Sequence, residues 1–126
     1  MAQGLTFDTG LLIAAEKGTR MFDAIWQESV ERRSRRTVPI PVLAQAWRSR
    51  AVMVARIVKA CTIEPLTEDR AREIGILLGK SGTSDVVDAS VVLGAIERGD
   101  GIVTSDPEDI ERLLDAVGAK LPVIRV

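Results

Sequence analysis

Histidine is absent from this chain of 126 residues, and cysteine occurs only once. Without an imidazole, the chain has no histidine base to activate a serine or cysteine nucleophile. Zinc is also disfavoured, because zinc sites usually combine His and Cys ligands. Cys61 lies in the apolar context KACTIEPL and is expected to be a buried, reduced thiol. These absences argue against chemistry based on imidazole or thiolate.

Long hydrophobic runs are also missing. No segment is apolar over the length needed to cross a bilayer, and the start, MAQGLTFDTG, lacks the charged and apolar regions of a secretion signal. We therefore expect a cytoplasmic protein that does not associate with membranes. Aromatic residues are few, with two Phe, two Trp and no Tyr, so no stacking platform for base recognition can be identified. Trp26 and Trp47 are expected in the core.

The length predicts a single domain over residues 1–126 that can bury a core without crosslinks. Charge is unevenly distributed along the chain. Residues 1–60 contain 10 Lys and Arg against 5 Asp and Glu, whereas residues 61–126 contain 7 against 13. This asymmetry is expected where an acidic metal site lies beside a basic surface that binds a polyanion. Solvated charges on separate helices explain it equally well.

Strand and helix patterns alternate along the chain. Strands are predicted at residues 4–8, 37–41, 61–66, 101–106 and 121–126. Helices are predicted at residues 11–18, 20–36, 42–60, 67–81, 86–100 and 107–119. This alternation predicts an α/β sandwich with a mainly parallel central sheet, in which functional sites collect at the carboxyl ends of the strands.

Acidic residues occur at the positions where such a site is expected. Asp8 and Asp106 each lie at the carboxyl end of a predicted strand, and Asp85 and Asp88 are three residues apart at the start of one predicted helix. Asp8, Asp85 and Asp106 could each serve as a helix N-cap. Asp88 differs, because its backbone N–H is expected to have a helical partner and its neighbours are apolar. A buried, unpaired carboxylate there is costly unless a cation offsets the cost.

The donor set predicts which cation this is. With oxygen ligands only, a hard ion such as Mg²⁺ or Mn²⁺ is favoured over zinc or copper. Mg²⁺ often completes its coordination shell with substrate phosphate, which points to metal-assisted hydrolysis of a phosphodiester. The DTG triplet of residues 8–10 also occurs in aspartic proteases, but those are β-rich, whereas helical patterns dominate this chain.

The order of the acids resembles that of a known family. Asp8 in LTFDTG, Asp88 in DVVDASVVLGAIERG and Asp106 in GIVTSD resemble the PIN-domain ribonucleases, in particular the VapC-type toxins of bacterial toxin–antitoxin pairs. The resemblance covers nearly the whole chain and implies a PIN-like three-layer sandwich, whose five-stranded, mainly parallel sheet is flanked by helices. It implies cleavage of RNA with Mg²⁺ or Mn²⁺, a homodimer and a small cognate antitoxin. Residues 22–26 and 51–58 would offer apolar surface to such partners.

One acidic position of the family pattern is not matched. Asp8, Asp88 and Asp106 match as catalytic and metal-binding residues, but the usual Glu, in the segment VLAQAWR, is replaced by Gln45. An amide can accept a contact through its oxygen, but it carries no charge and cannot act as a base. Asp85 is expected to supply the missing charge, ahead of Asp109. The protein is then either an active ribonuclease or a catalytically weakened PIN-like module that binds RNA or protein.

Other polar side chains near the acids are candidates for contacts with phosphate or metal-bound water. They are Thr9, Gln45, Arg48, Thr104 and Ser105. Arg48 lies about one helical turn after Gln45 and is expected to reach the same cleft, while the hydroxyls are also typical of helix starts. The run ERRSRR, residues 31–36, is either a rim for the RNA backbone or a set of cations at a helix C-terminus.

Overall fold

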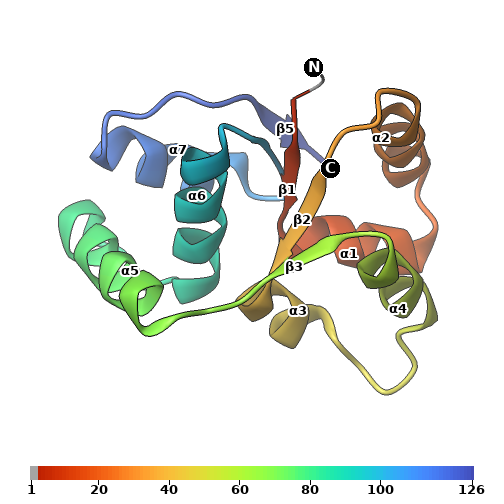
Figure 1. The fold of residues 1–126 in the computed structure, drawn as a ribbon, viewed down its shortest axis with the longest axis horizontal. Helices are drawn as coiled ribbons and strands as arrows, with labels where there is room; N and C mark the ends of the chain where they lie inside the picture. Colours follow the sequence, from red (N-terminus) through yellow and green to blue (C-terminus); the bar gives the residue numbers. More distant parts are fainter. Residues whose placement is uncertain (1–2) are drawn as a thin grey trace.

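A sheet of five parallel strands forms the centre of the computed structural model, which describes residues 3–126 (Figure 1). The strands are β1 (Leu5–Phe7), β2 (Arg36–Pro39), β3 (Thr62–Glu64), β4 (Gly101–Thr104) and β5 (Val123–Arg125). Their order is β3-β2-β1-β4-β5, and each neighbouring pair is parallel. The predicted α/β architecture is confirmed, with a sheet that is parallel throughout.

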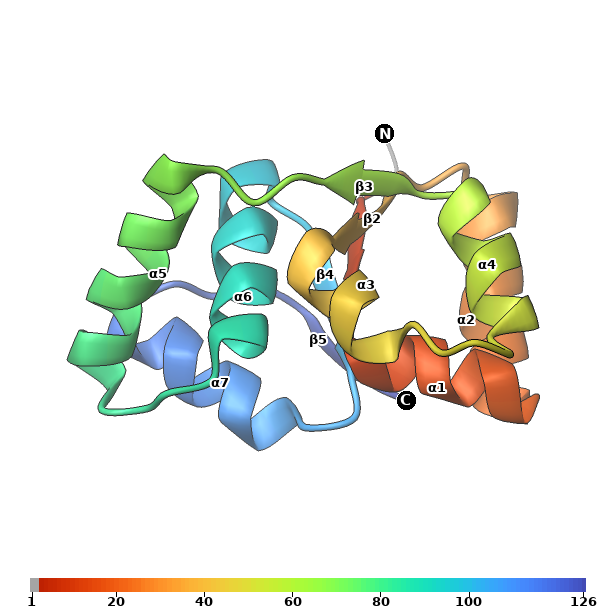
Figure 2. The same ribbon diagram turned by 90° about the horizontal axis from the view of Figure 1, so that it is seen from below.

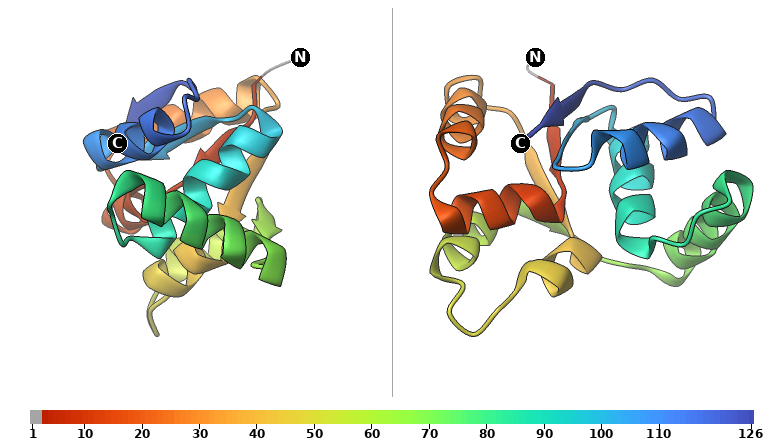
Figure 3. Two further views of the ribbon diagram at one scale, coloured as in Figure 1. Left: turned by 90° about the vertical axis from the view of Figure 1, so that its left-hand side faces the viewer. Right: turned by 180° about the vertical axis from the view of Figure 1, so that it is seen from behind.

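Helices cover both faces of the sheet. They are α1 (Thr9–Lys17), α2 (Arg20–Glu31), α3 (Ile40–Ala46), α4 (Val52–Lys59), α5 (Glu68–Ser81), α6 (Val86–Arg98) and α7 (Pro107–Ala116). Helices α1, α2 and α4 lie on one side and α5, α6 and α7 on the other, an arrangement also visible from behind (Figure 3). Seen from below, α3 lies between the two groups (Figure 2). Within residues 3–126, no helix is long and apolar enough to pass through a membrane.

Burial on both faces explains the composition of the central strands. Phe7, Ile102 and Val103 are fully buried, and every residue of β4 is buried. Strands covered on both faces are continuously apolar rather than alternating. Leu11 on α1 and Val91 on α6 pack from opposite sides and are also inaccessible to solvent. Because β1 and β4 are neighbours, Asp8 and Asp106 leave the sheet at the same edge.

The prediction of a single helix at residues 42–60 is wrong. The structure has two helices, α3 and α4, separated at residues 47–51. Glu16 of α1 explains the break, because its carboxylate accepts hydrogen bonds from the backbone N–H groups of Met53 (2.9 Å) and Val54 (3.2 Å). It therefore caps the start of α4, where two N–H groups would otherwise lack partners. Apolar periodicity alone could not reveal a cap supplied from α1.

Helix α2 is also shorter than predicted. It ends at Glu31, and Arg33 adopts a left-handed conformation with φ of 54°. Trp26 packs against the core as expected and stacks on Phe22, with ring centroids 5.9 Å apart. Trp47 does not: it follows α3 and is 49% exposed, so its expected place in the core is wrong.

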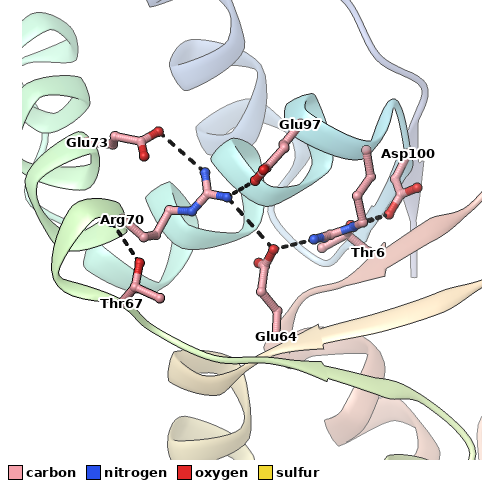
Figure 4. A network of polar contacts seen from close by, with 8 residues as sticks. Thr6, Glu64, Thr67, Arg70, Glu73, Glu97 and Asp100 are labelled. Carbon is pink, nitrogen blue, oxygen red and sulfur yellow. Dashed lines mark hydrogen bonds and ion pairs between the residues drawn. The ribbon is translucent and has the colours of Figure 1, made fainter.

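An ion-pair network joins β3, α5 and α6 (Figure 4). Arg70 of α5 pairs with Glu97, with Glu73 (3.6 Å) and more distantly with Glu64 (3.9 Å). Arg98 pairs with Glu64 and donates from Nε to Asp100 at 2.9 Å. Asp100 is only 1% exposed, and the Thr6 hydroxyl also donates to it. Each of these acids is thus balanced by an arginine.

Candidate active site

The acidic residues predicted from the sequence meet in one cleft of about 350 Å³. The residues that line it are Asp8, Thr9, Gly10, Ile13, Gln45, Arg48, Asp85, Asp88, Ser105 and Asp106. Every residue predicted for the site except Thr104 is among them. The acids come from three places: the β1–α1 junction, the start of α6 and the β4–α7 junction. The parallel sheet brings these segments together, because its strands end at one edge.

Asp8 is held in a fixed orientation at the start of α1. One carboxylate oxygen accepts the backbone N–H of Thr9 (2.7 Å), and the other accepts the hydroxyl of Thr104 (2.7 Å). Burial raises the pKa of Asp8, while these two hydrogen bonds oppose the rise. Negative charges at Asp85 and Asp106 raise it further. The side chain of Asp8 therefore caps α1 and lines the cleft at the same time.

Thr104 supports the site from behind. It is fully buried, so its hydroxyl does not face the cleft. It donates to Asp8 and accepts the backbone N–H of Asp106 at 3.0 Å. This hydroxyl therefore ties together the two acids that follow neighbouring strands. The structure assigns it to positioning Asp8, whereas the sequence left contact with phosphate or water open.

Asp88 carries the most perturbed carboxyl group of the cleft. It is 9% exposed, and burial raises its pKa to about 7, with added repulsion from Asp8, Asp85, Asp109 and Asp106. No cation among residues 3–126 lowers this pKa. Its backbone N–H bonds to the carboxylate of Asp85 at 2.9 Å, not to a helical carbonyl as predicted. Asp88 thus lies in the first turn of α6, where its side chain reaches the cleft.

Asp85 and Asp106 differ in how they begin their helices. Asp85 is the N-cap of α6, and its side chain makes the capping bond to Asp88. Asp106 holds the corresponding position before α7, but its side chain makes no capping bond. Both are exposed. Both residues therefore take the predicted N-cap positions, but only Asp85 caps with its side chain, and the carboxylate of Asp106 is left for the cleft.

Gln45, at the position where the family usually has Glu, is anchored by a neighbouring residue. Its Oε1 accepts the hydroxyl of Thr9 at 2.5 Å. Arg48 is anchored as well, since its Nη1 donates to the backbone carbonyls of Gln45 (2.8 Å) and Trp47 (2.7 Å) at the end of α3. The expectation that Arg48 reaches the cleft is confirmed.

Gly10 and Ile13 line the cleft but were not predicted. A Cβ at Gly10 would lie 2.3 Å from the Ser105 hydroxyl oxygen and 3.0 Å from the Ser105 backbone nitrogen. Only a glycine therefore allows α1 to approach the β4–α7 junction this closely. The signal in the sequence was a glycine in the first turn of a helix, directly after Asp8 and Thr9. Ile13 is 45% exposed and gives no such signal.

The fold places a further acid beside the cleft and the arginine-rich run far from it. Asp85 and Asp88 line a second hollow of about 320 Å³ together with Asp109 and Arg112. The run at residues 31–36 leads into the amino end of β2, so it lies at the edge of the sheet opposite the cleft. Arg36 from this run lies over the Trp26 ring at 4.5 Å. The structure thus separates this run from the acids.

The chemistry of the cleft fits a hard divalent cation, although the side chains do not form a closed ligand set. All donors are oxygens, and Asp88 lacks a balancing cation. Yet in the described part of the chain no three acidic or thiol side chains lie as close together as a bound ion requires. Asp8, Asp88 and Asp106 would hold the ion, and Asp85, which lines the same cleft, would add the negative charge that Gln45 lacks. Cys61 is only half-buried rather than buried as expected, and it is no candidate, because burial still raises the pKa of its thiol to about 11.

The arrangement of strands and helices matches that of a solved structure. The crystal structure of VapBC2 from Rickettsia felis, bound to a DNA fragment from their promoter, aligns with a TM-score of 0.69. The match covers 97% of this chain and 98% of the other, at 13% sequence identity. At that identity the likeness establishes the fold, which is PIN-like as the resemblance implied. The sequence matches no protein-family model and has no significant match among curated proteins.

Proposed function

We propose that this protein is a Mg²⁺- or Mn²⁺-dependent endoribonuclease, the toxin of a toxin–antitoxin pair. One observation carries the proposal: four carboxylates from three segments face one cleft without an arginine or lysine paired to them in residues 3–126. Such repulsion is costly in a merely structural role and useful where a cation binds. The PIN-like fold and the order of the acids agree with this function.

The chain's own residues suit phosphodiester hydrolysis. Asp8 is held rigidly by Thr9 and Thr104, so it need not reorganise when a ligand enters. Asp88 and Asp106 complete the acidic side of the cleft. A bound Mg²⁺ or Mn²⁺ would polarise the phosphate and lower the pKa of a bound water.

The alternative is a PIN-like module that binds RNA or protein but does not cut. Gln45 favours it, because the amide adds no negative charge and its oxygen is already engaged by Thr9. Asp85 supports the active enzyme instead, since it lines the cleft and raises the pKa of Asp88. We favour the nuclease, because the remaining acids are not balanced by cations.

We propose two partners: a small antitoxin, by analogy with VapBC2, and a second copy of the chain, as the resemblance to VapC-type toxins implies. Several apolar side chains are exposed on α1, α2 and α4 and would suit such contacts. They are Ile13, Met21, Val30 and Val52. We further propose that the protein acts in the cytoplasm, where its RNA substrate is available.

The decisive experiment measures RNA cleavage and metal binding on the same preparation. Protein freed of any partner is incubated with labelled single-stranded RNA and Mg²⁺, Mn²⁺ or EDTA. We expect cleavage with either ion only, and a loss of at least about 100-fold in Asp8→Asn and Asp88→Asn. Asp115→Asn, an exposed acid on α7 outside the cleft, is the matched control and should cut normally.

Calorimetric titration with Mn²⁺ separates the two functions. An active site binds the ion in the original protein and loses most of that binding in Asp88→Asn. If neither ion binds or restores cutting while RNA still binds, the binding module is correct and the nuclease proposal fails.

A further inference from the structure

The cleft has two chemically different sides. Asp8, Asp85, Asp88 and Asp106 carry negative charge, whereas Gln45, in the last turn of α3, and Arg48, just after that helix, carry hydrogen-bond donors. The proposed function uses the acids and leaves these donors without a role.

Gln45 presents its amide nitrogen rather than its oxygen. The Thr9 hydroxyl donates to Oε1 at 2.5 Å, and no group within residues 3–126 accepts from Nε2. A glutamate at this position would offer only acceptors, but the amide offers two N–H donors. The amide N–H groups do not repel an anion. The amide nitrogen cannot ligate a cation, because it has no free lone pair to donate. The substitution therefore changes what this corner of the cleft can bind.

Arg48 is preorganised in a similar way. Its Nη1 is fixed by two backbone carbonyls at 2.8 and 2.7 Å, whereas Nε and Nη2 donate to nothing among the described residues. Although four carboxylates line the same cleft, none comes within ion-pairing distance of it in residues 3–126. A guanidinium with unused donors, facing a cleft, is suited to phosphate oxygens.

We propose that Gln45 and Arg48 form a phosphate-binding wall that holds the RNA backbone against the acidic side of the cleft. Gln45 would donate through Nε2, and Arg48 through Nε and Nη2. On this assignment Gln45 is a substrate-binding residue and not a lost metal ligand. The inference rests on the proposed function, because it supplies the position of the substrate in that same site.

Binding, not cleavage, tests the wall. The affinity of a labelled single-stranded RNA is measured by fluorescence anisotropy in Ca²⁺ as a function of salt, and Mn²⁺ affinity is measured separately. Arg48→Gln keeps an amide that can still bond the carbonyls at the end of α3 but removes the charge. We expect a loss of about tenfold in RNA affinity and a salt slope reduced by about 0.7, as for one phosphate contact to a single strand.

Variants of Gln45 test the phosphate-binding wall independently of Arg48. Gln45→Ala should weaken RNA binding about threefold to tenfold without changing the salt slope, because the amide is neutral. Gln45→Glu keeps the acceptor for Thr9, so it should bind RNA less tightly while binding Mn²⁺ more tightly. Arg50→Gln is the matched control: it lies in the same loop, is exposed and does not line the cleft, and both affinities should be unchanged.

Failure of the wall and failure of the enzyme have different signatures. If the original protein binds Mn²⁺ and cuts RNA, but the Arg48 and Gln45 variants bind RNA as it does, the wall is wrong and the nuclease stands. If Arg48→Gln unfolds, as circular dichroism would detect, the Gln45 pair decides alone. A protein that binds neither Mn²⁺ nor RNA would overturn both proposals.

Discussion

Two groups of acids in this molecule are treated in opposite ways. In the network of Figure 4, Glu64, Glu73, Glu97 and Asp100 are balanced by Arg70 and Arg98. In the cleft, four aspartates lie together and pair with no arginine or lysine within residues 3–126. Arg48 and Arg112 are nearby, yet neither forms an ion pair there.

This difference in pairing suggests that the network serves stability and the cleft serves function. A buried acid that is paired with an arginine needs no further ligand. Removing the arginine would leave an uncompensated buried charge and destabilise the fold. An unpaired group of acids keeps the cost of uncompensated charge: burial, with added repulsion from the neighbouring aspartates, raises the pKa of Asp88. We infer that only the second group is kept for a ligand. Four measurements test this contrast.

The largest effect on stability is expected in the network. Arg98→Met leaves Asp100, which is 1% exposed, without its charged partner, and should lower the free energy of unfolding by about 3–5 kcal/mol. Urea denaturation measures it. Arg72→Ala is the control, because its pairs with Glu68 and Asp69 are exposed and should contribute less than about 1 kcal/mol. Equal losses in both variants would contradict a special role for the network.

Protonation of Asp88 should produce the next largest effect. Its pKa is about 7 in the folded protein and 3.8 for an ordinary aspartate, so between these values the folded state binds more protons. Stability should therefore fall as pH rises from about 4 to 7 and then level off, by about 2–4 kcal/mol from this group.

Asp88→Asn removes this charge and tests the sign. In EDTA the variant should be more stable than the original protein at pH 8 and should lack the Asp88 contribution at lower pH. Mn²⁺ should then stabilise the original protein at pH 8 but not the variant. An unchanged pH profile in the variant would show that Asp88 does not titrate in this range.

A smaller effect is expected behind the cleft. Thr104→Val keeps the shape but removes the hydroxyl that donates to Asp8, so the pKa of Asp8 should rise further. Stability should fall by about 1–2 kcal/mol, and Mn²⁺ should need a higher pH to bind. Thr104→Ser, which keeps the donor, should restore the pH dependence of Mn²⁺ binding. Failure of Ser to do so would exclude the hydrogen bond as the cause.

The smallest change in stability is expected for Asp85→Asn. Asparagine caps a helix about as well as aspartate, so α6 should lose less than about 0.5 kcal/mol. Mn²⁺ affinity should nevertheless fall severalfold, because a negative charge leaves the cleft. Asp109→Asn, which removes a charge outside this cleft, should change the affinity less. Unchanged affinity in Asp85→Asn would remove that residue from the site.

Much of the site was predictable because it depends on local order. Asp8 and Asp106 each follow a strand of a parallel sheet, and that position alone places both at one edge. Asp88 was identified by its apolar neighbours, and it is indeed buried. Asp106 takes the predicted N-cap position before Pro107, but its side chain makes no capping bond.

Contacts between distant segments account for what could not be predicted. The division of residues 42–60 depends on Glu16, which bonds Met53 and Val54 from another helix. Thr104 bonds Asp8 across 96 positions, and the side chains of Gln45 and Arg48 are oriented by Thr9 and by backbone carbonyls at the end of α3. No periodicity or local propensity encodes such contacts.

The amino-acid sequence specifies the alternation of strands and helices, the excluded chemistries and the identity of the acids, since these follow from residue type and spacing. The tertiary structure determines which of the charged side chains are paired and which are not. That outcome depends on distances between side chains remote in the chain, and these exist only once the parallel sheet has brought α1, α3, α6 and the β4–α7 junction to one edge.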